Sequence, residues 1–158
     1  MSLWFGQEVQ ALPRQTRLIL TLDIMGYKEQ KQRQFDIRYL QMARVWAENS
    51  YCVRRKVGAL LVKDKMIISD GYNGTPAGFE NICEDDMGTT KPYVLHAEAN
   101  AITKVAKSAN NCDGSTLYVT ASPCIECAKL IIQESEPQRI RTATPRTCTA
   151  LITTTTAR

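Results

Sequence analysis

The sequence is poor in histidine, with a single one, His96, among 158 residues. It also has no apolar run approaching the roughly 20 residues that cross a membrane. The apolar stretch 18–24 is short, contains Asp23 and is not followed by a small-residue cleavage site, which argues against a secretory signal. From these absences we expect a cytoplasmic protein that does not associate with a membrane.

An excess of charge is absent from the centre of the chain. The formal net charge is +4, but residues 35–133 carry 11 basic and 11 acidic side chains. The segments before and after this region contribute +2 each. Because a domain that binds nucleic acid normally carries a basic face, we expect no nucleic-acid partner.

A second Cys-x-x-Cys pair is also absent. The six cysteines have no regular spacing, which is typical of metal ligands and buried thiols in a reducing compartment. The one such pair, Cys124 and Cys127, also fits a zinc ribbon or a redox motif. A structural four-cysteine site requires a second matching pair, so these two alternatives are less favoured.

The cysteine pair has a partner motif upstream in the chain. A catalytic zinc ion takes three nitrogen or sulfur ligands and leaves its fourth position to water. Cysteines three apart at the start of a helix lie on one face of its first turn, and Pro123 suits a helix entrance. We therefore predict that His96, Cys124 and Cys127 bind one Zn²⁺.

Glu98 follows the histidine by two residues. Loss of ammonia at a zinc site needs a proton carrier beside the metal, and Glu98 stands where such a carrier is required. The combined pattern, His-x-Glu followed by Pro-Cys-x-x-Cys, is typical of zinc deaminases, in which the glutamate is the acid and base rather than a ligand.

The hydrophobic pattern of residues 35–133 predicts alternating helices and strands. A helix capped by Asp36 is followed by two apolar runs that form a hairpin around residues 63–65. A helix opened by His96, a strand over 116–120 and a helix opened by Cys124 complete the order. This order predicts an α/β fold around a mixed sheet. The first helix is expected to bury Ile37, Leu40, Ala43, Trp46 and Ala47.

The run 36–133 resembles the deoxycytidylate deaminase family of the cytidine deaminase superfamily. Four segments carry the resemblance: 54–59 (RRKVGA), 71–79 (GYNGTPAGF), 96–102 (HAEANAI) and 122–129 (SPCIECAK). The zinc motif is common to the whole superfamily, whereas the motif at 71–79 is restricted to a much smaller group of its members. The resemblance implies a three-layer α/β/α cytidine-deaminase-like fold with a mixed central sheet.

The same resemblance implies a reaction, a substrate and further site residues. The expected activity is hydrolytic deamination of dCMP to dUMP and ammonia by a zinc-bound hydroxide, which supplies dUMP for thymidylate synthesis. Glu98 would shuttle the protons and Asn73 would contact the sugar. Substrate contacts are also implied for Ala97 and Thr75. Arg54, Arg55 and Lys56 are candidates to neutralise the 5′-phosphate or an effector triphosphate, with a solvated surface as the alternative. Many members of the family are homo-oligomers that respond to dCTP and dTTP, and both properties are expectations here.

Two other cysteines, Cys52 and Cys83, have two possible roles. Some members of the family carry ligands of a second, structural zinc at these places. The simpler interpretation, which we favour, is a pair of buried free thiols.

The two ends of the chain depart from the family pattern. Residues 1–34 are expected to be an N-terminal extension, with a polar lead-in from about residue 25, before the deaminase domain of 35–133. Residues 134–158 lack strand alternation and helical periodicity. We therefore expect the C-terminal strands of the fold to be missing or altered, as in a disordered or frameshifted tail.

Two other functions are consistent with the sequence. The first is another deaminase of the superfamily, acting on tRNA adenosine, a free base or a riboflavin precursor. The second is a truncated, non-catalytic zinc-binding remnant, which the unusual tail favours and the retained Glu98 disfavours.

Overall fold

The structure, a computed structural model, describes residues 13–134 and 139–143. The chain divides into two compact units, residues 1–37 and residues 38–158. The second unit contains the sheet and the helices packed on it. Within the described residues, no helix combines the length and apolarity that crossing a bilayer demands.

Helix α2 spans Arg14–Ala47 and is much longer than expected. The prediction that this helix begins at Asp36 is wrong, because the helix starts directly after Pro13 and Asp36 is internal. The Asp36 carboxylate accepts a hydrogen bond from Nε2 of Gln32 at 2.8 Å, one turn earlier. Residues 14–35 contain no proline and many straight-chain helix formers, so the helix extends through the expected polar lead-in.

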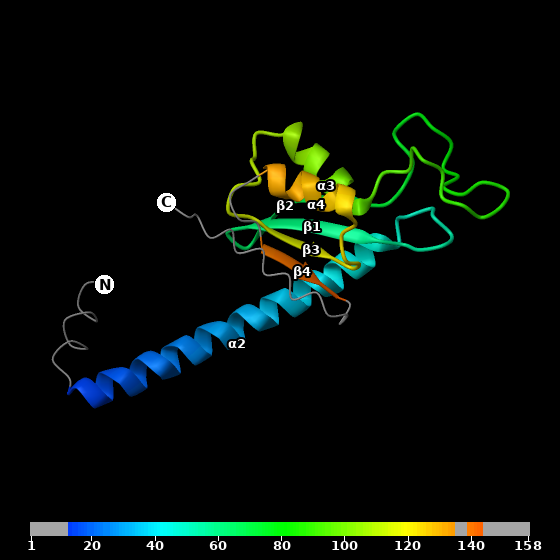
Figure 1. Ribbon diagram of the computed structural model, residues 1–158. Helices are drawn as coiled ribbons and strands as arrows, with labels where there is room; N and C mark the ends of the chain where they lie inside the picture. The colour runs from blue at the N-terminus through cyan, green and yellow to red at the C-terminus, as the bar shows by residue number, and fades with distance from the viewer. Residues whose placement is uncertain (1–12, 135–138, 144–158) are drawn as a thin grey trace. The chain divides into compact units, whose positions relative to one another are not determined.

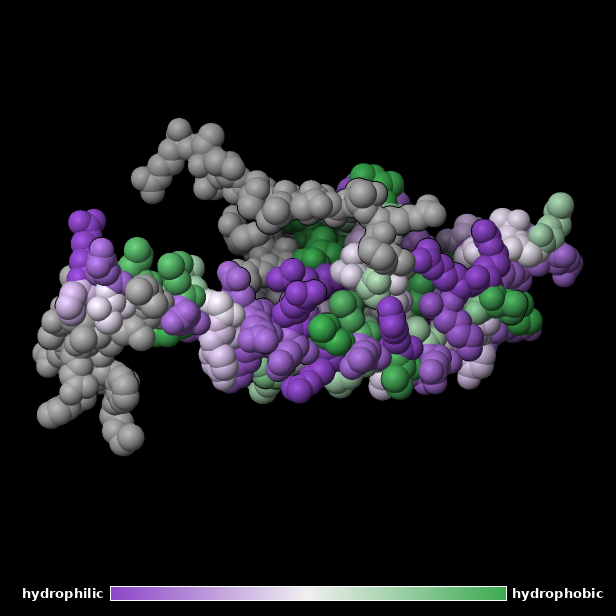
Figure 2. Space-filling model, turned by 90° about the horizontal axis from the view of Figure 1, so that it is seen from below, coloured by the Kyte–Doolittle hydropathy of each residue, from purple (hydrophilic) through white to green (hydrophobic). Residues whose placement is uncertain are grey.

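The first part of α2 carries apolar side chains that are not buried. Leu18, Leu22 and Met25 are all more than half exposed. Figure 2 shows this side of the molecule as mainly hydrophilic, with hydrophobic spots set apart from one another. These three side chains follow the i, i+4, i+7 spacing of one helix face, but that face is not buried.

The buried face of α2 matches the predicted stripe only in part, and Leu40 is only partly buried. Ala43 and Ala47 are buried as expected, but Ile37 is 49% and Trp46 38% exposed, and Tyr39 is buried instead. The Tyr39 ring packs on the Tyr118 ring of the sheet, with 5.0 Å between the ring centroids. Trp46 lies at the margin, where Nε1 donates to Asp70 at 2.7 Å. The indole N–H needs a hydrogen-bond acceptor, and at the margin of the core it reaches the Asp70 carboxylate.

Strands β1 (Gly58–Lys63) and β2 (Met66–Tyr72) form the predicted antiparallel hairpin. Asp64 and Lys65, which connect them, have φ values of 50° and 64°. A two-residue turn with two positive φ angles is the type I′ turn that matches the twist of a hairpin.

Strand β3 (Thr116–Val119) pairs antiparallel with β1, and β4 (Arg139–Thr142) pairs parallel with β3. The sheet order is β2-β1-β3-β4, which confirms the mixed sheet. The expectation of a tail without strands is wrong at 139–142, where Ile140 also packs against the core. The run 139–142 has a single apolar residue, Ile140, so it lacks the hydrophobic pattern that identified the equally short β3. The rest of the predicted tail, 135–138 and 144–158, lies outside the described residues.

Helices cover both faces of the sheet, as Figure 1 shows. A Cβ added to Gly58 of β1 would overlap the carbonyl oxygen of Ala43 and lie 2.7 Å from the backbone nitrogen of Ala47. The backbone of α2 therefore touches the backbone of the sheet directly at this glycine.

On the opposite face lie α3 (Ala97–Ala106) and α4 (Ile125–Glu134). A Cβ added to Gly71 of β2 would overlap the carbonyl oxygen of Ala97 and lie 2.7 Å from the backbone nitrogen of Ala101. The N-terminal turn of α3 is thus held against β2. The core between this face and its helices consists of Ala59, Leu61, Ala97, Ala101, Ile102, Val105, Cys112, Leu117, Val119 and Ile131.

Candidate active site

His96 is the N-cap residue of α3, with φ −75° and ψ 156°. The residue before it, Leu95, exchanges two backbone hydrogen bonds with Gly74, at 3.1 and 2.9 Å. Because Gly74 follows β2 closely, this bridge brings the chain back to the end of that strand before α3 begins. The imidazole is thereby placed at the N-terminal end of α3, as predicted.

Cys124 and Cys127 stand at the corresponding end of α4. Cys124 directly precedes the helix, and its carbonyl oxygen accepts the first-turn hydrogen bond from Ala128 N at 2.9 Å. Cys127 lies within the first turn and is 2% exposed. Both helices therefore direct their N-terminal ends to one place, and such ends favour thiolates.

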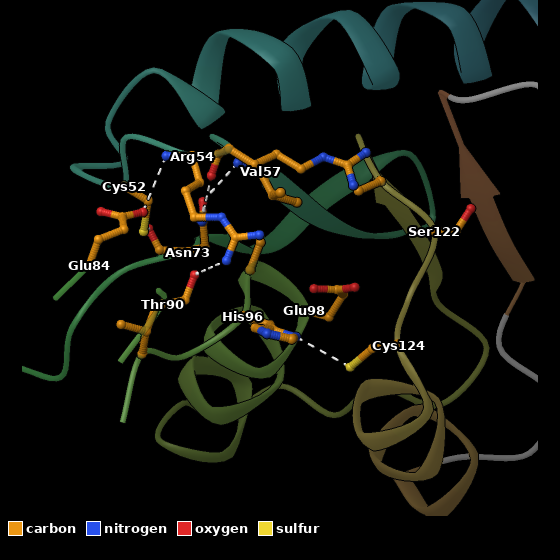
Figure 3. A pocket seen from close by; sticks show the side chains of 14 residues that line it. Cys52, Arg54, Val57, Asn73, Glu84, Thr90, His96, Glu98, Ser122 and Cys124 are labelled. Carbon is orange, nitrogen blue, oxygen red and sulfur yellow. Dashed lines mark hydrogen bonds between the residues drawn. The ribbon is translucent and has the colours of Figure 1, made fainter. Parts of the chain in front are cut away.

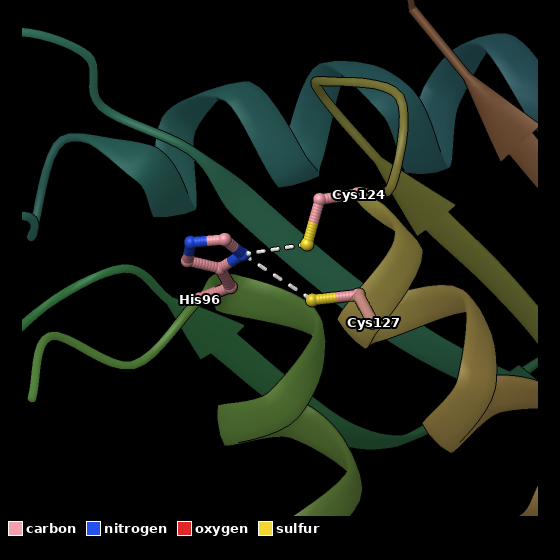
Figure 4. Close-up of side chains that lie close together, drawn as sticks. All are labelled: His96, Cys124 and Cys127. Atoms are coloured by element: carbon pink, nitrogen blue, oxygen red, sulfur yellow. Dashed lines mark hydrogen bonds between the residues drawn. The ribbon is translucent and has the colours of Figure 1, made fainter. Parts of the chain in front are cut away.

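The three predicted ligands meet in space, as Figure 4 shows. Nδ1 of His96 lies 3.3 Å from the sulfur of Cys124 and 3.3 Å from that of Cys127. Within the described residues, this is the one group of three or more histidine, cysteine or acidic side chains arranged to hold a metal ion. Tetrahedral zinc, with bonds of about 2.3 Å to sulfur and 2.0 Å to nitrogen, places neighbouring donors about 3.6 Å apart. The residues present therefore fit Zn²⁺ in number, type and spacing.

Glu98 lies in the first turn of α3 beside this cluster and is 3% exposed. Burial raises the pKa of the Cys127 thiol, and the negative charge of Glu98 raises it further. A metal cation has the opposite effect, since it stabilises a coordinating thiolate. The carboxylate is not among the three clustered side chains, and its role as proton carrier stays a prediction.

A pocket of about 400 Å³ opens over His96, Glu98 and Cys124 (Figure 3). This volume lies in the range of small-molecule sites. Of the predicted substrate contacts, Asn73, Ala97 and Arg55 line the pocket and Thr75 does not. The hydroxyl of Thr75 instead lies 3.5 Å from Oδ1 of Asn81.

Asn73 joins two walls of this pocket. Its Oδ1 accepts a hydrogen bond from Val57 N at 2.7 Å, and its Nδ2 donates to the carbonyl oxygen of Arg55 at 2.8 Å. The amide nitrogen has two protons, so one donor remains beyond the contact with Arg55. The side chain therefore fixes the segment that enters β1 and can still donate one hydrogen bond into the pocket.

Cys52 and Cys83 are both buried, as expected, but they are not free thiols. The structure pairs them in a disulfide between segments 31 residues apart. The expectation of two free thiols is thus wrong, and a disulfide offers no thiolate to a second metal ion. Which cysteines pair cannot be deduced from their positions in the sequence.

Six further residues line the pocket without having been predicted as site residues. They are Val57, Glu84, Thr90, Val94, Ala121 and Ser122. Ala121 and Ser122 directly precede the Pro-Cys motif, and Val57 lies in the segment 54–59, so these three had a usable signal. The other three lie in the irregular segment between β2 and α3, where no periodicity points to them.

The fold and the site together define a zinc-dependent deaminase of the cytidine deaminase type. A family model described as the cytidine and deoxycytidylate deaminase zinc-binding region matches residues 33–144. The chain therefore belongs to the cytidine and deoxycytidylate deaminase family, whose members are zinc-dependent hydrolases. This confirms the family, the fold class and the cofactor predicted from the sequence.

Particular relatives make the likeness more specific. The deoxycytidylate deaminase of Enterobacteria phage T4 is 34% identical over 60% of this chain and 70% of its own length. That of Homo sapiens is 38% identical over 60% of this chain, which spans only 57% of the human protein. Among solved structures, the dCMP deaminase of cyanophage S-TIM5 in complex with dCMP and dUMP has a TM-score of 0.64 and 37% identity. That match covers 69% of this chain and 96% of the cyanophage chain.

Proposed function

We propose that this chain catalyses hydrolysis of dCMP to dUMP and ammonia, and so supplies dUMP for thymidylate synthesis. The observation that carries the proposal is the meeting of three side chains that fit zinc beside the buried carboxylate of Glu98, with His96, Glu98 and Cys124 lining one pocket. The relatives named deoxycytidylate deaminase, and the cyanophage structure with dCMP and dUMP, support this substrate.

Glu98 carries the protons in the proposed reaction. Zn²⁺ held by His96, Cys124 and Cys127 would supply a water of lowered pKa near neutral pH. Glu98 would accept a proton from that water, give it to N3 of cytosine, and then help to protonate the departing amino group. Water adds at C4, the C4–N4 bond breaks, and the products are dUMP and ammonia. Burial of Glu98 keeps the proton transfers away from bulk solvent.

The remaining pocket residues hold the nucleotide in the proposed complex. Asn73 places the sugar with its remaining amide proton, and Ala97 contributes backbone at the base. Arg54 and Arg55 both line the pocket, whereas the ammonium group of Lys56 donates to the Glu48 carbonyl oxygen at 3.3 Å. We assign the 5′-phosphate to the two arginines, because guanidinium groups bind phosphate oxygens in pairs.

Three wider properties belong to the same proposal. They are a cytoplasmic location, assembly into a homo-oligomer, and control by dCTP and dTTP.

Ammonia release from dCMP tests the proposed reaction. Purified chain with its zinc content measured is supplied with dCMP, dCTP, deoxycytidine or an adenosine-containing tRNA anticodon stem. We expect turnover of dCMP, and in Glu98→Gln a loss of about 10²- to 10⁴-fold with zinc still bound.

The matched control is Glu126→Gln. Glu126 lies in the first turn of α4, as Glu98 does in α3, but its carboxylate is exposed and paired with Lys129 at 2.6 Å. This variant is expected to keep wild-type turnover. Full activity in Glu98→Gln, or wild-type protein that binds zinc and releases no ammonia from dCMP, would contradict the proposal. Turnover of the tRNA alone would identify a different deaminase.

A further inference from the structure

A short backbone hairpin stands at the rim of the pocket, in the segment 83–91 between β2 and α3. Lys91 N donates to the carbonyl oxygen of Cys83 at 2.8 Å, and Glu84 and Thr90 form an antiparallel bridge. Because the two arms are paired, Glu84 and Thr90 are held opposite each other, and both line the pocket.

The carboxylate of Glu84 binds backbone across the pocket rim and pairs with no side chain of the hairpin. Oε1 accepts hydrogen bonds from Val53 N at 3.1 Å and Arg54 N at 3.2 Å, and Oε2 lies 3.2 Å from Val53 N. Hydrogen bonds to an ionised acceptor are about twice as strong as neutral ones. Glu84 thereby fixes the backbone from which the Arg54 side chain extends.

The other arm of the hairpin meets the far end of the same arginine. Nη1 of Arg54 donates to the hydroxyl oxygen of Thr90 at 3.5 Å. A hydrogen bond of this length is weak, so it orients the guanidinium but adds little stability. Figure 3 shows the guanidinium above His96 and on the side of the pocket toward Thr90. The hairpin therefore holds Arg54 at its backbone through Glu84 and at its guanidinium through Thr90.

The disulfide reinforces this arrangement at the neighbouring residues. Cys83 directly precedes Glu84, and Cys52 directly precedes Val53, so the covalent bond joins the two segments that the carboxylate spans. The Cα atoms of the two cysteines are 5.1 Å apart. The carboxylate thus faces the two N–H groups over a short, fixed gap.

We propose that Glu84 is a positioning residue that orients Arg54 for the nucleotide phosphate. This rests on the proposed function, because it assumes that a nucleotide monophosphate occupies the pocket. Glu84 acts through Arg54 and does not itself touch the substrate. If Glu84 acted on the phosphate directly, the effect on affinity would be opposite, because the carboxylate repels the phosphate and its removal would lower the Kd.

The test is a double-mutant cycle on affinity for the product dUMP, measured by titration calorimetry on zinc-loaded full-length chain. The variants are Glu84→Ala, Arg54→Ala and the double variant, with Glu84→Gln as the conservative replacement. The control is Glu80→Ala, an exposed carboxylate of the same loop that does not line the pocket. Thermal unfolding of every variant reports whether its fold is intact.

We expect Glu84→Ala to raise the Kd for dUMP roughly tenfold, and Glu84→Gln to raise it less because one acceptor oxygen remains. In the Arg54→Ala background, Glu84→Ala should have no further effect, since the group it orients is gone. Additive effects, an unchanged Kd, or a lowered Kd in Glu84→Gln would overturn the inference.

The result also separates this inference from the proposed function. If the wild-type chain binds dUMP but releases no ammonia from dCMP, the proposed reaction is wrong, and the double-mutant cycle on dUMP affinity still decides the role of Glu84. Wild-type chain that neither binds dUMP nor turns over dCMP overturns both.

Discussion

At the residue scale, the proposed zinc ligands are placed by features that are local in the sequence. His96 caps one helix, and Cys124 and Cys127 begin another, so each ligand has its position set by a helix start that the sequence marks. Helix starts are marked by short motifs, and a three-residue cysteine spacing has one geometry in a first turn. For this reason the metal centre could be predicted before any tertiary contact was known.

Cys127→Ala tests the metal centre with a matched control. The substitution removes one of three protein ligands, so we expect zinc to fall from about one per chain to well below half after dialysis against a weak chelator. Cys112→Ala removes an equally buried cysteine from the core and should leave zinc content unchanged. Metal analysis of both proteins decides the matter, and equal zinc in the two variants would show that Cys127 is not a ligand.

Other residues of the site could not be predicted because their partners are distant in sequence. The bond between Cys52 and Cys83, and the contact of Glu84 with Val53 and Arg54, join segments about 30 residues apart. Such contacts depend on how the irregular segment 74–95 folds back, and no local pattern encodes that path.

At the element scale, the sequence predicted the hairpin and the two zinc-bearing helices but misplaced the beginning of α2 and missed β4. Asp36 has the chemistry of an N-cap, yet the preceding residues are themselves good helix formers and the helix continues through it. Strand β4 is four residues long and gains its pairing from β3, which is a tertiary effect. Local pattern is weakest for elements of this kind.

Gly71→Ala and Gly58→Ala form a matched pair at the two helix contacts. Each added methyl group meets helix backbone, so we expect each variant to lose roughly 1 to 3 kcal/mol of unfolding free energy in urea. Gly71 contacts the turn of α3 that carries His96 and Glu98, whereas Gly58 contacts α2. Gly71→Ala should therefore also lower zinc retention and dCMP turnover. These losses should exceed those of Gly58→Ala, although the two variants lose similar unfolding free energy. Equal losses of zinc in the two variants would contradict this assignment.

At the scale of the whole molecule, the described core and the pocket lie in the unit of residues 38–158. The family model begins at residue 33, close to the boundary of that unit. The predicted start of the deaminase domain at residue 35 stays a prediction. The long helix that crosses this boundary was not expected, since the resemblance supplied no template for it.

A pair of identical substitutions measures how stability is distributed between the units. Leu61 is fully buried in the core, and Leu22 of α2 is 59% exposed. We expect Leu61→Ala to lower the unfolding free energy by about 2 to 5 kcal/mol and Leu22→Ala to change it by no more than about 0.5 kcal/mol. Urea unfolding followed by circular dichroism provides both values. A large loss in Leu22→Ala would show that α2 is packed against something in solution.

The presence of only one histidine has a practical consequence for spectroscopy. Because His96 is the sole imidazole in the sequence, labelling histidine with ¹⁵N gives one ring and one set of resonances, with no assignment needed. The chemical shifts of that ring differ between a free and a metal-bound nitrogen and report which nitrogen is bound. The state of the catalytic centre can therefore be followed in intact protein, through metal loading, nucleotide binding and product release, by a single signal.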